Sequence, residues 1–173
     1  MKIHPIFVHF PIALLITYAM VEILPLKRWF SRIHWDSVKT FLVFFGTIGA
    51  VAAAAAGDID EKSLALGLRN ILEVHKFFAA TTTLVFGVLS AAYILRWAFQ
   101  EYPQLFTERF RFLSFVRQPL RWISDLILIR WITVSLALVG LIAVSITGAL
   151  GGIMVYGVDA DPFGKFIYSL FFG

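Results

Sequence analysis

Four long apolar runs constrain this chain more than any other feature of its sequence. They cover about residues 5–26, 40–57, 75–97 and 128–156. As α-helices, runs of this length cross a hydrocarbon core of about 30 Å. Because 60% of the residues are hydrophobic and only 15% are charged, a water-soluble domain is excluded. We expect an all-α fold, an integral membrane four-helix bundle, in which residues 1–173 form a single domain.

Two other segments are expected to lie in the membrane interface as amphipathic segments. Residues 104–117 interleave Phe and Leu with Arg109, Arg111 and Arg117. This pattern is typical of a helix that lies among lipid headgroups, and the alternative is a docking helix for a partner. The tail, residues 157–173, is aromatic but too short to span. We expect it in the outer interface or packed on a neighbouring subunit.

The basic residues predict the orientation, because Lys and Arg near the ends of spans stay in the cytoplasm. Ten of them flank one side: Lys27, Arg28, Arg32, Lys39, Arg96, Arg109, Arg111, Arg117, Arg121 and Arg130. The other side has five, set among six acidic residues: Lys2, Lys62, Arg69, Lys76 and Lys165. We therefore expect a multi-pass protein with both termini outside. Nucleic-acid binding is not expected, because the arginines flank spans and form no single basic face.

Three of the four histidines, His4, His9 and His75, fall at the outer ends of spans, whereas His34 lies in the basic inner loop and is expected to be exposed. Ionisable residues inside a membrane are expensive and indicate a functional site. The chain has no cysteine, which excludes disulfides, thiolate metal sites, iron–sulfur clusters and covalently attached haem. Histidine, carboxylate, Met and Tyr side chains remain as possible ligands.

Helix-start signals predict that two of these histidines lie at the same depth. Pro5 suits a first helical position, which makes His9 the fifth helical residue. In the third span, Asn70 and Glu73 resemble a capping box, which makes His75 the fifth helical residue as well. Both imidazoles are then about 6–8 Å inside their helix starts.

Small residues occupy the same outer half of the bundle. Residues 46–57 of the second span are mostly Ala and Gly and end at Gly57, and the fourth span carries Gly148 and Gly152. One interpretation is plain helix packing, because small residues let backbones approach closely. The other is that these faces leave room for a flat macrocycle between the histidines.

The second interpretation predicts haem b, with His9 and His75 as the two axial ligands to the metal and with His4 able to replace His9. Lys76 and Arg69 lie where the propionates of an outward-pointing haem would emerge, and pairing cations with carboxylates is favourable. Bis-His ligation leaves no open position on the iron, which favours electron transfer over oxygen activation.

Other cofactors stay open. A single histidine can bind the magnesium of a chlorophyll-type pigment, and the outer histidines with Asp58 or Asp60 can hold a zinc or copper ion. A chain with no cofactor is the remaining case. A hydrolase is unexpected, because the sequence has no Gly-x-Ser-x-Gly elbow and no phosphate-binding Gly loop. Glu22 has no evident partner in the sequence, and we expect it at the inner interface.

The opening motif also resembles a known family. His4-Pro5-Ile6-Phe7-Val8-His9-Phe10-Pro11-Ile12-Ala13-Leu14-Leu15 is similar to the start of small bacterial membrane proteins known as domain of unknown function 2231, as are Gly57-Asp58-Ile59-Asp60, His75 and Gly151-Gly152-Ile153-Met154-Val155-Tyr156. The resemblance implies a four-helix membrane domain in a bacterial inner membrane and no settled activity. The chain departs from the family after Gly157-Val158, where Asp159-Ala160-Asp161-Pro162 and an aromatic segment replace a Gly-Val-rich tail.

Taken together, the sequence predicts a membrane-embedded b-type haem-binding electron-transfer protein without independent catalysis. Its expected partners, besides the lipid bilayer, are an outer-side cytochrome, a quinone or a larger respiratory or photosynthetic complex. The alternative is a cofactor-free structural or accessory subunit of such a complex, docked through the aromatic segments at residues 106–115 and 163–172.

Overall fold

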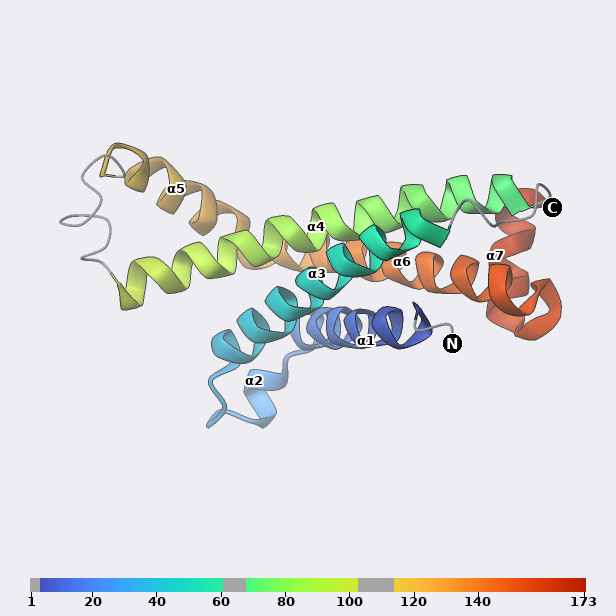
Figure 1. Ribbon diagram of the computed structural model, residues 1–173. Coiled ribbons are helices and arrows are strands. Elements are labelled where there is room, and N and C mark those ends of the chain that lie inside the picture. Colours follow the sequence, from blue (N-terminus) through green and yellow to red (C-terminus); the bar gives the residue numbers. More distant parts are fainter. Residues whose placement is uncertain (1–3, 61–67, 103–113) are drawn as a thin grey trace.

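A computed structural model describes residues 4–60, 68–102 and 114–173, and in these ranges all regular structure is helical. The elements are α1 (His4–Ile23), α2 (Leu26–Trp29), α3 (Trp35–Asp60), α4 (Arg69–Glu101), α5 (Ser114–Ile127), α6 (Arg130–Tyr156), the 3₁₀ turn η5 (Val158–Ala160) and α7 (Pro162–Phe172) (Figure 1). The predicted all-α class is confirmed.

Three helices are long and apolar enough to cross a membrane, judged by length and composition. They are α3 over Trp35–Ala56, α4 over Arg69–Glu101 and α6 over Arg130–Tyr156. In α1 the apolar stretch Val8–Ile23 is shorter. The whole of α1 has 20 residues, which corresponds to a length of about 30 Å. A fourth span at α1 stays a prediction.

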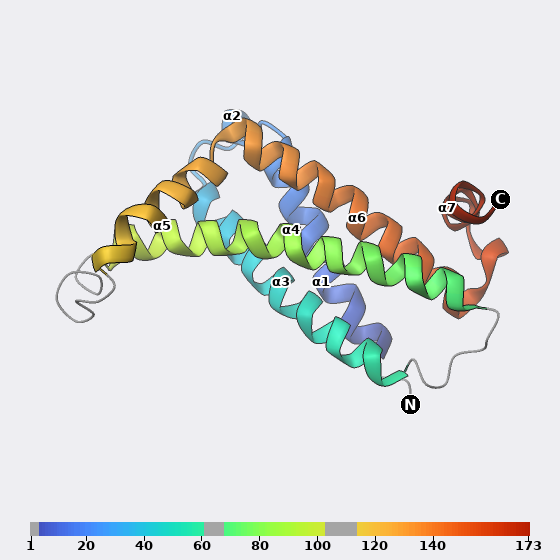
Figure 2. The same cartoon turned by 90° about the horizontal axis from the view of Figure 1, so that it is seen from above.

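The four long helices pack in a ring, with α1 and α4 each lying against both α3 and α6. Every helix contributes to the central core, for example Tyr18 from α1, Val43 from α3, Phe86 from α4 and Val144 from α6. Both chain termini lie at one end of the bundle, here called the terminal end (Figure 1). At this end the pair α1 and α3 separates from the pair α4 and α6 (Figure 2).

Glycines on α3 let α1 approach closely. A Cβ atom added at Gly49 would lie 2.9 Å from Cβ of Pro11, and one added at Gly46 would lie 2.6 Å from Cδ2 of Leu15. A side chain at Gly49 would meet a proline ring fixed to the backbone, and one at Gly46 would require the Leu15 side chain to move, so the helix-packing interpretation holds at these two positions. They do not form an open wall for a macrocycle.

The C-terminal helix α7 crosses the terminal ends of α4 and α6 steeply (Figures 1 and 2). It starts where Asp161 accepts a hydrogen bond from the Gly164 amide at 2.8 Å, with Pro162 at the first helical position. Gly164 and Ile167 are buried in α7, and Ile167 packs in a cluster with Ile153 of α6. The short tail predicted at residues 157–173 is thus a defined helix set across the bundle end.

Several predicted boundaries differ from the structure. Asn70 is not a helix cap: α4 begins at Arg69, after Leu68, whose apolar side chain makes no capping hydrogen bond. The amphipathic helix is α5, Ser114–Ile127, whereas most of the predicted segment 104–117 lies outside the described residues. Helix ends differ from pattern-based expectations because capping depends on local geometry and packing.

Candidate functional site at the terminal end

His75 of α4 is held against the backbone of α6. Its Nδ1 lies 3.0 Å from the carbonyl oxygen of Thr147. A carbonyl oxygen only accepts hydrogen bonds, so Nδ1 carries the proton and donates it. When the ring is neutral, Nε2 then bears the lone pair, on the side of the ring away from Thr147. This is the form in which histidine binds a metal, and such ligands commonly donate their other ring N–H to a backbone carbonyl.

Glycine makes this contact possible. A Cβ atom at Gly151 would lie 3.5 Å from Cε1 of His75, so the ring rests on a part of α6 that has no side chain. One turn earlier, a Cβ atom at Gly148 would lie 3.9 Å from Cδ1 of Ile12 in α1. No atom outside the helix's own turn lies within 4 Å of a Cβ built at Gly152. On successive turns of α6, Gly148 thus lies against α1 and Gly151 against α4. Gly152 has open space beside it.

The helix positions also relate His9 to His75. His9 is the sixth residue of α1 and His75 the seventh of α4, one and two residues deeper than expected. His9 lies three residues before Ile12, on the same side of α1 and one turn nearer the terminal end. Because α6 runs antiparallel to α1, the turn of α6 at that depth is the one that contains Gly151. The contacts of α1 and α4 thus indicate that both histidines lie at the depth of one turn of α6, where His75 is half-buried and His9 is exposed.

The other predicted site residues lie at the same end of the bundle. Lys76 is half-buried directly after His75, and Arg69 is exposed in the first turn of α4. His4 is the first residue of α1, and Gly57 lies in the last turns of α3. The side-chain surroundings of His4 and Gly57 lie outside what the structure describes. Among the described residues, no group of three or more His, Cys, Asp or Glu side chains comes together as a metal site.

Comparison with known proteins identifies the family. A family model described as "Predicted membrane protein (DUF2231)" matches residues 1–161. The chain belongs to this family. No curated protein and no solved structure was found to match the chain. The family match confirms the resemblance carried by the His4–Leu15 motif, and it ends just before α7.

A second polar cluster, at the opposite end of the bundle, was missed by the sequence analysis. The Glu22 side chain, expected at the interface without a partner, is buried, with only 4% of the residue exposed. Its Oε2 lies 3.0 Å from Nζ of Lys39 in α3 and accepts a hydrogen bond from the Tyr93 hydroxyl in α4 at 2.8 Å. The expectation was wrong because the partners are 17 and 71 residues away in the sequence. The sequence does contain one signal for this cluster. Glu22, Lys39 and Tyr93 can be compared by their depth in their spans, and this comparison could have predicted that they meet.

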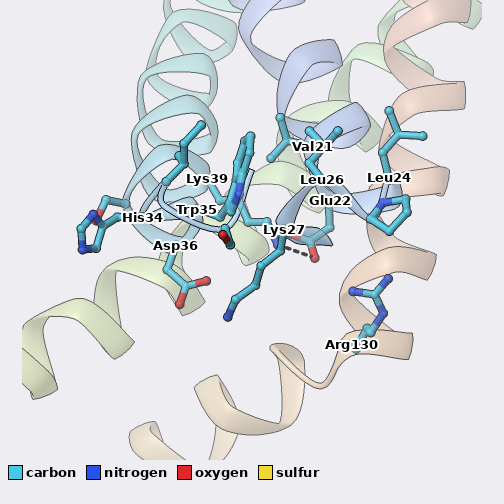
Figure 3. Close-up of a pocket in the computed structure, with 14 residues that line it drawn as sticks. Val21, Glu22, Leu24, Leu26, Lys27, His34, Trp35, Asp36, Lys39 and Arg130 are labelled. Atoms are coloured by element: carbon cyan, nitrogen blue, oxygen red, sulfur yellow. Dashed lines mark hydrogen bonds and ion pairs between the residues drawn. The ribbon is translucent and has the colours of Figure 1, made fainter. Parts of the chain in front are cut away.

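A hollow of about 370 Å³ adjoins this cluster, and Glu22 and Lys39 form part of its wall (Figure 3). The Arg130 guanidinium at the start of α6 points toward the Glu22 carboxylate (Figure 3). His34, which lines the same hollow, is exposed as expected. The two ends of the bundle therefore differ in chemistry: imidazoles beside a glycine face at the terminal end, and a buried carboxylate paired with a lysine at the other.

Proposed function

We propose that this protein is a membrane-embedded b-type haem-binding electron-transfer protein whose haem is held at the terminal end by His75 and His9. The observation that carries the proposal is the hydrogen bond from His75 Nδ1 to the Thr147 carbonyl. It fixes the tautomer and the orientation of the ring, which are the two properties that a metal ligand requires.

The surroundings of His75 suit a flat macrocycle. Gly151 lets the His75 ring lie on the backbone of α6, Gly152 has open space beside it, and His9 is at the same level on α1. A bound haem would supply reversible one-electron chemistry, while two imidazole ligands leave no open iron position. The chain's own part is to hold the ligands and to keep water away with the surrounding apolar helices. Lys76 and Arg69 are placed to pair with propionates.

The visible spectrum of the full chain, purified in detergent after expression with haem precursor, tests this proposal. We expect a Soret band and a sharp α-band on reduction. A colourless preparation that is folded and monodisperse would refute haem binding. A chlorophyll-type pigment would instead give red absorption with magnesium, and elemental analysis would reveal a zinc or copper ion.

A matched set of variants separates ligation from structure. His75→Asn keeps an N–H donor near the Nδ1 position, directed at the Thr147 carbonyl, but has no counterpart of Nε2. We expect it to fold and to lose the α-band, whereas His34→Asn, at the opposite end, should keep the full spectrum. Full haem content in His75→Asn would exclude His75 as an axial ligand.

For location and partners we propose a bacterial inner membrane, with both termini on the periplasmic side and a redox partner or larger complex meeting the terminal end. The excess of basic residues in the loops at the opposite end supports this orientation. The lipid bilayer itself follows from the family and from the three long apolar helices.

One observation favours a cofactor-free accessory subunit as the second candidate. The outward face of α7 exposes Phe163, Phe166 and Leu170, and α7 lies beyond the family match. Large exposed apolar patches mark interaction sites with proteins or membranes. Phe166→Ser with Leu170→Ser leaves the buried Ile167 in place. If this double variant no longer co-purifies with a complex that retains the unaltered chain, α7 is the docking helix.

A further inference from the structure

Two adjoining hollows at the end opposite the termini form one basic pocket. They have volumes of about 360 and 370 Å³ and share Pro25, Lys27 and Arg130 in their walls. Arg28 lines the smaller of the two. Lys27 and Arg28 come from the short helix α2, and Arg130 begins α6. The basic pocket thus brings together cations from segments about 100 residues apart.

The charge balance of the basic pocket is positive. Its acidic residues are Glu22 and Asp36. The Glu22 carboxylate is already neutralised by Lys39 at 3.0 Å and hydrogen-bonded by Tyr93. Across both hollows four cations, Lys27, Arg28, Lys39 and Arg130, stand against the two carboxylates of Glu22 and Asp36, which leaves a net charge of +2. A net positive hollow attracts an anion.

Exposed tryptophans set the depth of the basic pocket in the membrane. Trp29 directly follows Arg28 and is 67% exposed, and Trp131 directly follows Arg130 and is 81% exposed. Tryptophan is enriched at the level of the lipid headgroups. We infer from this that both arginines lie at the depth of lipid phosphates, with the apolar wall residue Leu24 in the same hollow system.

We propose that the basic pocket binds the headgroup of an anionic phospholipid. Guanidinium groups of Arg28 and Arg130 recognise phosphate through paired N–H donors, and the Lys27 ammonium adds a point charge. Basic pockets between helices on the cytoplasmic side of a membrane are suited to such lipids. We commit to a lipid over free phosphate because the tryptophans place the cations at the membrane surface. This proposal does not depend on haem binding.

Native mass spectrometry of the full chain, exchanged from detergent into mixtures of phosphatidylglycerol and phosphatidylcholine, tests it. We expect one retained phosphatidylglycerol per chain with about a tenfold preference over phosphatidylcholine. Lys27→Gln with Arg130→Gln should reduce the preference to about onefold. The matched control is Arg32→Gln, an exposed base of the same loop that lines neither hollow, and it should retain the preference.

Other outcomes overturn the proposal. Equal retention of both lipids by the unaltered chain, or a preference undiminished in the double variant, would exclude a headgroup site. Displacement of the lipid by millimolar inorganic phosphate would show a phosphate-ion site and refute the commitment to a lipid. Should the Arg130 variant not fold, Lys27→Gln with Arg28→Gln alters only exposed side chains of α2 and decides the same question.

Discussion

At the scale of single residues, Glu22 and Lys39 form a buried ion pair inside the bundle. The two side chains are only 5% and 16% exposed. Removing one partner of a buried pair leaves an uncompensated charge and typically costs about 3–5 kcal/mol. We therefore expect Lys39→Met to lower the unfolding free energy by about that amount, measured by reversible denaturation in mixed micelles.

The double variant Glu22→Gln with Lys39→Met should lose less than Lys39→Met alone, because no unpaired charge stays buried. Lys165→Met is the matched control: its pair with Asp159 also spans 3.0 Å, but the side chains are 68% and 87% exposed. An exposed pair contributes about 0–1 kcal/mol. Equal losses in Lys39→Met and Lys165→Met would show that the Glu22 cluster does not stabilise the bundle.

Single residues also mark the limit of prediction from sequence. The sequence predicts His75 as a candidate site residue because an ionisable group at the end of an apolar run is costly. Its partner was not predictable, because the Thr147 acceptor is a backbone carbonyl and every residue of α6 has one. Glu22 was noticed for the same reason as His75, but pairing it with Lys39 and Tyr93 requires the relative depth of three helices.

At the scale of elements, the contact between α1 and α3 depends on Gly49. A Cβ atom there would lie 2.9 Å from the Cβ of Pro11, which is part of a ring fixed to the α1 backbone and cannot rotate away. We expect Gly49→Ala to lower the free energy of unfolding by about 1–3 kcal/mol, because the two helices must move apart. The melting temperature should fall accordingly. Tryptophan fluorescence during heating in detergent measures the melting temperature.

Gly87→Ala provides the control for this prediction, because a Cβ atom at Gly87 meets nothing within 4 Å. Alanine favours a helix over glycine by about 0.5–1 kcal/mol, so the melting temperature should stay equal or rise. Identical melting temperatures for Gly49→Ala and Gly87→Ala would contradict the close packing of α1 on α3.

The elements themselves were largely predictable, whereas their ends were not. Apolar length alone indicated α3, α4 and α6, because a bilayer requires long uninterrupted helices. The same rule does not set a boundary once a helix leaves the hydrocarbon core, and α4 extends at both ends beyond the predicted 75–97. The amphipathic α5 was placed too early in the chain. Its arginines Arg117 and Arg121 continue a pattern that began before it.

At the scale of the whole molecule, the two proposals place different functions at the two ends of the bundle. The terminal end carries His9, His75 and α7, and the opposite end carries the Glu22 cluster and the basic pocket. The proposed redox partner and the proposed anionic lipid therefore act on opposite sides. Both proposals rely on one orientation, which the basic residues predict.

Cysteine labelling tests that orientation directly, because the chain has no cysteine of its own and the unaltered protein gives no background. Ala160 in η5 and Ser31 between α2 and α3 are small, exposed residues at opposite ends of the bundle. In intact spheroplasts, a membrane-impermeant maleimide should label Ala160→Cys, and it should label Ser31→Cys only after permeabilisation. The reverse pattern would place the termini in the cytoplasm, move the histidines to the inner face and remove the basis for a periplasmic redox partner. Labelling of both variants before permeabilisation would contradict an odd number of spans between residues 31 and 160, and with it the predicted topology.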